Sequence, residues 1–279
     1  MKKVVLITGS SSGIGRATAV LFAAKGWSVV ATMRNPAEDT ELTAQSNVLL
    51  TQLDVLDGVS IGSAIAAGVE RFGAIDVVIN NAGYGQYGLF EAIPRQKIQE
   101  QFDVNVFGVM EVTRAVLPHF RKNKGGLIIN ISSGAGLFTL PMISLYCASK
   151  FALEGFSEAL SYELASQNIG VKLVIPHGGV TSTRFSERSS TNRATESSLT
   201  DYDDFVERTN QAFARMTAAR TMTSGEVAQV IYEAATDGTD RLRYLVGNDA
   251  RGYIQAKQTM SDEEYVAFMR SQFVSPPEQ

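Results

Sequence analysis

Two side chains one helical turn apart could together transfer a proton. Tyr146 and Lys150 stand four positions apart in the run Tyr-Cys-Ala-Ser-Lys, and side chains at that spacing share one face of a helix. A phenol titrates near pH ~10, and a cation close to it favours the ionised form. We therefore expect Lys150 to lower the pKa of Tyr146 and to make it an acid/base. Ser133, upstream, adds a hydroxyl that can donate to a reacting oxygen.

A glycine-rich turn near the amino terminus predicts a nucleotide site. The run Thr-Gly-Ser-Ser-Ser-Gly-Ile-Gly follows an apolar segment and begins a helical pattern. Glycine lets backbone N–H groups approach a pyrophosphate, which the positive end of the following helix also favours. Such a run can also be only a turn, but its place between a strand and a helix favours dinucleotide binding. The candidate cofactor residues here are Gly9, Ser11, Ser12, Gly13, Ile14 and Gly15.

Short apolar runs alternate with longer helical patterns along the chain. Strands are predicted at residues 4–7, 28–31, 48–52, 77–79, 127–131, 172–175 and 244–246, and helices at 14–25, 58–72, 95–121, 146–167 and 224–236. Apolar strands separated by helices predict a parallel sheet with helices on both faces. The fold class is therefore α/β: a single-domain Rossmann fold with a doubly wound, seven-stranded parallel sheet.

Composition suits one large domain and excludes several classes of protein. The chain has 279 residues, 44% of them hydrophobic, and a net charge of −4 without a long basic run, so nucleic acid is an unsuitable partner. No stretch reaches the ~18 apolar residues of a membrane span. The single Cys147 excludes an intramolecular disulfide, and His119 and His177 are too scattered for a metal site. We expect a cytoplasmic protein that acts on a small molecule and binds no metal.

One segment departs from the rest in composition. Residues 181 to 221 are rich in Ser, Thr and charge, with helical spacing recovering around residues 202 to 216. Long loops in compact domains are commonly functional, and lids that close over a site are one such function. Within a single domain of residues 1–279, we therefore predict that residues 182–222 form an insertion that covers substrate and cofactor.

These motifs together resemble those of the short-chain dehydrogenase/reductase family over almost the whole chain. The family's Thr-Gly-x-x-x-Gly-x-Gly turn is matched by residues 8–15, its Asn-Asn-Ala-Gly motif by residues 80–83, and its Tyr-x-x-x-Lys by Tyr146 and Lys150. The family serine lies thirteen residues before the tyrosine, which selects Ser133 over Ser132. The resemblance implies an oxidoreductase that moves a hydride between a nicotinamide and a carbonyl or alcohol carbon.

The resemblance also implies a role for each catalytic residue. Tyr146 supplies or removes the proton, and Ser133 donates a hydrogen bond to the reacting oxygen. Lys150 lowers the pKa of Tyr146 and bonds the nicotinamide ribose. Asn105, in Phe-Asp-Val-Asn-Val-Phe-Gly, holds a water that connects the lysine to solvent.

Further cofactor contacts are carried over in the same way. Beyond the glycine turn they are Asp54, Val55, Asn81, Ala82, Gly83, Tyr146, Lys150, Gly178 and Val180, with a hydroxyl from residues 181 to 183. The family bonds the adenine at the position of Asp54, although that residue could instead cap the following helix. One departure from the family is His177-Gly178, where Pro-Gly is usual.

The end of the second predicted strand bears on cofactor choice. An acid about 20 residues beyond the glycines would hold the ribose 2′-hydroxyl of NAD. Met33 occupies that position, and Arg34 beside it offers a planar donor fork suited to a 2′-phosphate. NADP(H) is therefore favoured over NAD(H), the alternative being that Arg34 is only a solvated loop residue.

Substrate and assembly are suggested by resemblance to one branch of the family. Residues 31–36, 80–87, 146–156 and 244–250 are similar to the branch with 17β-hydroxysteroid and retinol dehydrogenases, which implies a lipophilic alcohol or ketone. Aromatic residues that could line its cleft are Tyr84, Tyr87, Phe90, Phe138 and Tyr202. Family members commonly pair helices equivalent to 95–121 and 146–167 between subunits, which implies a homodimer or homotetramer.

Two other functions compete with this one. The first is a non-enzymatic NADP-binding regulator of the same fold, and intact Ser133, Tyr146 and Lys150 disfavour it. The second is a sugar-nucleotide epimerase or dehydratase of the extended family branch. Such an enzyme would prefer a Gly-x-x-Gly-x-x-Gly turn and a longer C-terminal domain, neither of which the sequence shows.

Overall fold

The computed structural model describes residues 2–39, 41–177, 179–180, 199–218, 222–248 and 252–274. A single sheet of seven strands forms its centre, in the order β3-β2-β1-β4-β5-β6-β7, with every neighbouring pair parallel. The strands are β1 Val4–Ile7, β2 Ser28–Met33, β3 Val48–Gln52, β4 Val77–Asn80, β5 Gly126–Ile131, β6 Ile169–His177 and β7 Arg243–Gly247. The order reverses between β1 and β4, where open α/β sheets bind their ligands.

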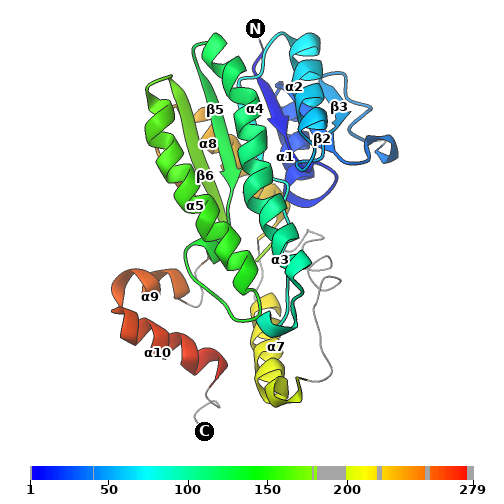
Figure 1. Ribbon diagram of the computed structural model, residues 1–279. Helices are drawn as coiled ribbons and strands as arrows, with labels where there is room; N and C mark the ends of the chain where they lie inside the picture. Colours follow the sequence, from blue (N-terminus) through cyan, green and yellow to red (C-terminus); the bar gives the residue numbers. More distant parts are fainter. Residues whose placement is uncertain are drawn as a thin grey trace.

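Helices cover both faces of the sheet (Figure 1). The α-helices of the described residues are α1 Gly13–Ala24, α2 Gly58–Phe72, α3 Arg95–Phe102, α4 Gly108–Lys122, α5 Ser144–Ala165, α7 Asp203–Ala218, α8 Ser224–Thr236, α9 Tyr253–Thr259 and α10 Asp262–Phe273. One core contains Phe22 of α1 and Ile231 of α8, and the other contains Ile61 of α2, Val112 of α4 and Leu160 of α5. The predicted doubly wound α/β fold is confirmed.

The predicted helix at 95–121 is interrupted in the structure. A π-helical turn, Asp103–Phe107, separates α3 from α4. Gly108 follows the turn and packs closely on the loop after β3, because a Cβ added there would lie 2.7 Å from the Val55 side chain. Single π-helical turns are frequent at functional sites, and this one contains Asn105.

Two helices near the carboxyl terminus were not predicted. Helix α10 begins with a capping box, in which Ser261 and Glu264 satisfy each other's backbone N–H groups. With α9 and α7 it lies beyond the carboxyl ends of the strands (Figure 1). Among the helices that the structure describes, none has the length and apolarity to span a bilayer.

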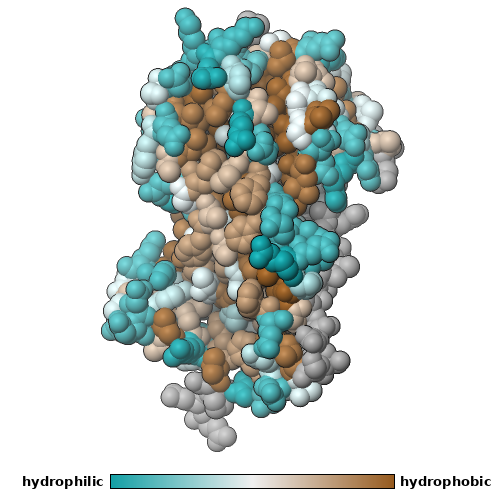
Figure 2. Space-filling view, viewed as in Figure 1, coloured by the Kyte–Doolittle hydropathy of each residue, from teal (hydrophilic) through white to brown (hydrophobic). Residues whose placement is uncertain are grey.

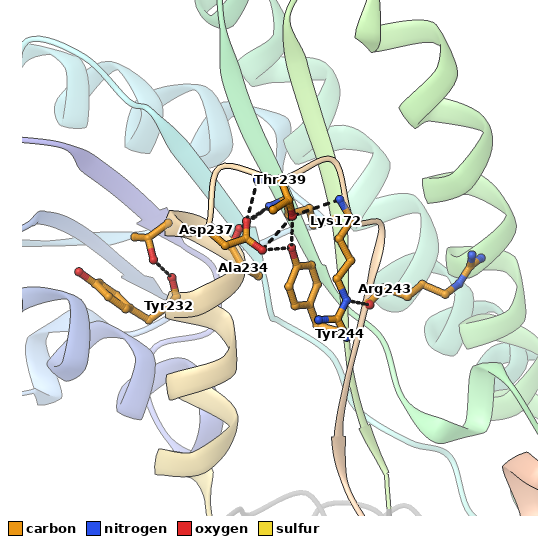
Figure 3. Close-up of polar contacts among 9 residues, drawn as sticks. Lys172, Tyr232, Ala234, Asp237, Thr239, Arg243 and Tyr244 are labelled. Carbon is orange, nitrogen blue, oxygen red and sulfur yellow. Dashed lines mark hydrogen bonds and ion pairs between the residues drawn. The ribbon is translucent and has the colours of Figure 1, made fainter.

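An ion pair between the buried Lys172 and the partly exposed Asp237 joins β6, β7 and the end of α8 (Figure 3). Lys172, which is 5% exposed, donates to the Ala234 carbonyl at 2.9 Å and to Asp237 Oδ1 at 2.6 Å. The Tyr244 hydroxyl donates to the other oxygen of Asp237. Burial favours the neutral acid, but hydrogen bonds from Lys172, Tyr244 and Thr239 outweigh it and hold the pKa of Asp237 well below its ordinary value. The Lys172–Asp237 ion pair, together with Tyr244, therefore holds β7 against the sheet. It lies away from the carboxyl ends of the strands.

Candidate active site

The glycine turn between β1 and α1 is shaped to admit a pyrophosphate. Gly9 and Gly13 have positive φ angles of 71° and 57°. A Cβ on Gly15 would lie 2.3 Å from the Gly9 carbonyl oxygen, so only glycine fits there. Ser12 N-caps α1 without a side-chain hydrogen bond, which leaves the N–H groups of the first turn for another acceptor. These residues fit the phosphates of a dinucleotide.

Asn81 supports this turn from behind. Its side-chain amide donates to the carbonyls of Thr8 and Gly9, at 2.9 and 3.1 Å. The Thr8 hydroxyl in turn accepts from the backbone of Asn81 and Ala82, both at 3.0 Å. Gly83 follows, where a Cβ would lie 3.1 Å from Asn105 Oδ1. The Asn-Asn-Ala-Gly segment therefore holds the turn in shape, and its predicted contacts with the cofactor stay a prediction.

The predicted adenosine end lies at the ends of β2 and β3. The N–H of Ser10 donates to the Thr32 carbonyl at 2.8 Å, which places the turn beside the end of β2. Met33 is buried in the core, whereas Arg34 is exposed. The Arg34 guanidinium is thus accessible to a phosphate.

Asp54 and Val55 follow β3. Asp54 accepts from the N–H of Leu56 at 3.0 Å, while the cap of α2 is Asp57, which accepts from Val59. The alternative that Asp54 caps α2 is therefore wrong, and its adenine contact stays a prediction. Val55 is 8% exposed and packs against α4 near Gly108.

Tyr146 and Ser133 meet at the carboxyl end of β5. Ser133 follows the strand and its hydroxyl accepts from the N–H of Ala135 at 3.2 Å, capping a short 3-10 turn. Tyr146 lies in the first turn of α5, half-buried, and a side-chain hydrogen bond joins it to Ser133. The two hydroxyls can thus act on one oxygen of a substrate.

Lys150 does not act on the phenol as predicted. Its Nζ donates to the Ile131 carbonyl at 2.8 Å and lies 5.7 Å from the centre of the Tyr146 ring. Burial raises the pKa of Tyr146 to about 12, with the Ser133 hydrogen bond opposing it. Burial also lowers the pKa of Lys150 to about 8. The expected lowering of the phenol pKa is wrong for the structure without ligand, because desolvation dominates and the ammonium is bound to a backbone carbonyl.

Asn105 connects the loop after β4 to helix α5. It is 1% exposed, and its side chain accepts from the N–H of Tyr84 at 3.1 Å and donates to the Tyr84 carbonyl at 2.8 Å. It also donates to the Ser149 hydroxyl at 3.2 Å, which donates to the Tyr146 carbonyl. The side chain is fully engaged in holding the backbone, and the predicted water beside Asn105 stays a prediction.

Gln101 is a supporting residue that the sequence reasoning missed. It is 0% exposed and one turn before Asn105. It accepts from the N–H of Gln86 at 2.6 Å and donates to the Tyr84 carbonyl at 2.9 Å. Two amides four positions apart in a predicted helix were the available signal, since they share a helix face.

Helix α7, which belongs to the predicted insertion, packs against Tyr87 in the loop that follows β4. Tyr87 donates to Asn210 of α7 at 2.9 Å, and its ring lies 5.8 Å from that of Phe213. Its hydroxyl is also 3.6 Å from the sulfur of Met142, four residues before Tyr146. The described part of the insertion therefore contacts Tyr87, which also contacts Met142 near the start of α5.

The other aromatic candidates divide into buried and exposed groups. Phe138 packs in an apolar cluster with Tyr253 and Ile254 of α9. Phe90 and Tyr202 are 63% and 39% exposed, and Tyr202 donates to Glu91. Phe138 therefore has the apolar surroundings expected of a residue that lines a lipophilic cleft, whereas Phe90 is exposed to solvent.

Part of the predicted site lies outside the described residues. Gly178, the hydroxyls of residues 181–183, and residues 182–198 and 219–221 of the predicted lid belong there. Val180 is described and forms a parallel bridge with Met222. In the described ranges no group of three or more His, Cys, Asp and Glu side chains could hold a metal.

The family model for short chain dehydrogenases matches residues 3–194. The chain belongs to the short-chain dehydrogenase family. It is 38% identical over 254 residues to the uncharacterized oxidoreductase YusZ of Bacillus subtilis, covering 88% of this chain and 89% of YusZ. It is also 39% identical over 188 residues to human retinol dehydrogenase 8, covering 64% of this chain and 60% of that protein.

A solved structure shows the same fold with a cofactor. A short-chain dehydrogenase/reductase from Burkholderia phymatum in complex with NAD has a TM-score of 0.78 and 25% identity, covering 100% of this chain and 98% of that one. With the family match, this identifies the chain as an oxidoreductase acting on CH–OH groups with NAD(P).

Proposed function

We propose that this enzyme transfers a hydride between NADP(H) and the carbonyl or alcohol group of a lipophilic substrate, with Tyr146 as its acid/base. The observation that carries the proposal is the pairing of the Tyr146 and Ser133 hydroxyls beside Lys150. A non-enzymatic regulator would not need such a pair, so we retain that function only as the alternative.

The residues of the chain divide the chemistry between them. NADPH, when bound, supplies the hydride. Ser133 donates a hydrogen bond to the oxygen on which charge develops, and Tyr146 donates the proton. Burial keeps the pKa of Tyr146 at about 12, so the phenol is protonated at neutral pH. A protonated phenol can donate the proton that carbonyl reduction requires.

Lys150 is suited to restoring that proton. Its pKa is lowered by burial to about 8, so the ammonium can lose and regain a proton near neutral pH. Its hydrogen bond to Ile131 holds the ammonium beside the Tyr146 ring. We propose that it also bonds the nicotinamide ribose, and that Gly9, Gly13 and Gly15 receive the pyrophosphate.

Arg34 supports NADP(H) over NAD(H). A charge-assisted contact with the 2′-phosphate contributes roughly 1.5–3 kcal/mol, or about ten- to a hundredfold in affinity. We expect Arg34→Ala to remove most of the preference for NADPH and to leave NADH affinity unchanged. Titration of NADPH and NADH against the wild type and the Arg34→Ala variant measures the two affinities. An unaltered NADPH affinity in Arg34→Ala would show that Arg34 does not bind the 2′-phosphate.

The substrate is proposed from the apolar cluster beside the site. Phe138 packs with Tyr253 and Ile254, and Leu137, Leu140 and Met216 adjoin them. The relative named retinol dehydrogenase 8 supports a lipophilic alcohol or ketone. In a series of ketones and aldehydes of graded size, we expect NADPH oxidation, followed at the nicotinamide absorbance, to be fastest with large apolar members. Turnover only of small polar carbonyls would contradict this substrate class.

We also propose that the enzyme is a homodimer or homotetramer. Phe107 at the start of α4 and Phe151 on α5 are 50% and 41% exposed. Figure 2 shows apolar side chains along the face formed by α4 and α5. A second copy could cover them, and sedimentation of a single 30.2 kDa species would contradict this assembly.

We further propose that residues 182–222 act as the lid, to be tested by hydrogen exchange with and without NADPH.

A further inference from the structure

An ion-pair cluster ties helix α1 to the loop after β2. Arg16 directly follows Gly15 of the glycine turn, and its guanidinium pairs with the carboxylate of Asp39. It also donates to Glu41 Oε2, from Nη2 at 2.6 Å and from Nε at 3.2 Å. The Asp39 side chain is 6% exposed, against 65% for Glu41. Asp39 is therefore a nearly buried carboxylate with a single arginine as its cation.

The loop that holds Asp39 is short and anchored. Asp39 accepts from the N–H of Leu42 at 2.9 Å, and Leu42 is 0% exposed in the core beside α1. The N–H of Asp39 donates back to Pro36, closing a 3-10 turn at Pro36–Glu38. Arg34 stands just before that turn, so Arg34 and Asp39 are parts of one small loop at the end of β2.

We propose that Arg16 determines cofactor specificity by neutralising Asp39, a carboxylate that would otherwise repel the 2′-phosphate of NADP(H). The inference rests on the proposed use of that cofactor. The glycine turn lies beside the end of β2, through the Ser10–Thr32 hydrogen bond, so a bound adenosine ribose lies near both Arg16 and this loop. A partly buried charge is weakly screened, and its effect extends over the Debye length of ~8 Å.

The charge on Asp39 is present at working pH. Burial favours the neutral acid, but the hydrogen bond from Arg16 and that from the Leu42 N–H lower its pKa. Without Arg16 the carboxylate would lack its cation, and its charge would repel a phosphate bound at the end of β2, as the acid that holds the 2′-hydroxyl of NAD does in other dinucleotide sites. Loss of Arg16 should therefore weaken NADPH binding and spare NADH binding.

The test is a double-mutant cycle on binding. Dissociation constants for NADPH and NADH are measured by nicotinamide fluorescence for wild type, Arg16→Met, Asp39→Asn and the double variant. We expect Arg16→Met to lower the NADPH-to-NADH affinity ratio about tenfold, Asp39→Asn to keep or raise it, and the double variant to restore it. Arg16→Lys should keep the ratio. A matched control is Arg114→Met, whose partner Glu111 lies on the same helix, α4.

Three outcomes would overturn the inference. An affinity ratio in Arg16→Met equal to that of the wild type would show that Arg16 only stabilises the fold. An equal loss of affinity for both cofactors would show the same. A lower ratio in Asp39→Asn would show that the carboxylate does not repel the phosphate. The proposed preference for NADP(H) is tested separately: it is wrong if the wild type binds NADH more tightly than NADPH. The cycle does not depend on that result, because it compares the affinity ratio of each variant with that of the wild type.

Discussion

Tyr146→Phe is expected to lower the turnover number by two to four orders of magnitude. A positioned general acid contributes ~10²–10⁴ in rate, and within the site the phenol is the group placed with Ser133 to donate a proton. The variant keeps the aromatic ring, so the packing at the start of α5 and the affinity for NADPH should be unchanged. Steady-state kinetics and a fluorescence titration of NADPH measure the two quantities.

A control on the same helix separates chemistry from packing. Tyr162, 70% exposed on α5, donates to Glu158 at 3.1 Å and loses the same oxygen in Tyr162→Phe. That variant should keep full turnover. A Tyr146→Phe enzyme with wild-type turnover would show that another group supplies the proton.

Asp237→Asn is expected to lower the free energy of unfolding by about 1–3 kcal/mol, because it removes the charge from a partly exposed carboxylate that accepts hydrogen bonds from Lys172 and Tyr244. Lys172, which is 5% exposed, would lose the carboxylate that it pairs with. Denaturation by urea measures the change. Asp262→Asn is the control, because its pair with Lys257 is exposed and should contribute less than about 1 kcal/mol.

The pH dependence of stability follows from the same carboxylate. The folded pKa of Asp237 is depressed, so its stabilisation is complete above the unfolded value of ~3.9 and is lost as pH falls below it. The stability difference between wild type and Asp237→Asn should therefore shrink below pH ~4. A difference that is constant from neutral pH to pH ~3 would show that the ion pair does not cause the effect.

The sheet was predictable because its signals are local. Runs such as residues 4–7 and 77–79 are apolar throughout, as strands buried on both faces must be, and the structure places them side by side as β1 and β4. The helix at 58–72 was predicted with the bounds that the structure gives. The strand at 172–175 was predicted short, because Gly170 and Pro176, which are unfavourable in strands, lie near the ends of β6, whose bounds are Ile169–His177.

The site was less predictable because it depends on contacts between distant segments. The spacing of Tyr146 and Lys150 indicated the centre, but their pKa values depend on burial beneath other elements, which a spacing does not contain. The hydrogen bonds of Gln101 to Tyr84 and of Arg16 to Glu41 span 17 and 25 positions. Helix α9 was missed since no motif marked it, whereas α10 was missed although Ser261 and Glu264 form the Ser-x-x-Glu pattern of a capping box.

The most direct test of hydride transfer with Tyr146 as the acid uses labelled cofactor. NADPH carrying deuterium at its hydride position is mixed with the enzyme and a lipophilic ketone, and the product alcohol is analysed by mass spectrometry. We predict deuterium on the carbinol carbon with wild type and, over the same time, at least a hundredfold less with Tyr146→Phe. Absence of label with wild type across the ketone series, or equal labelling by the two proteins, would contradict the account.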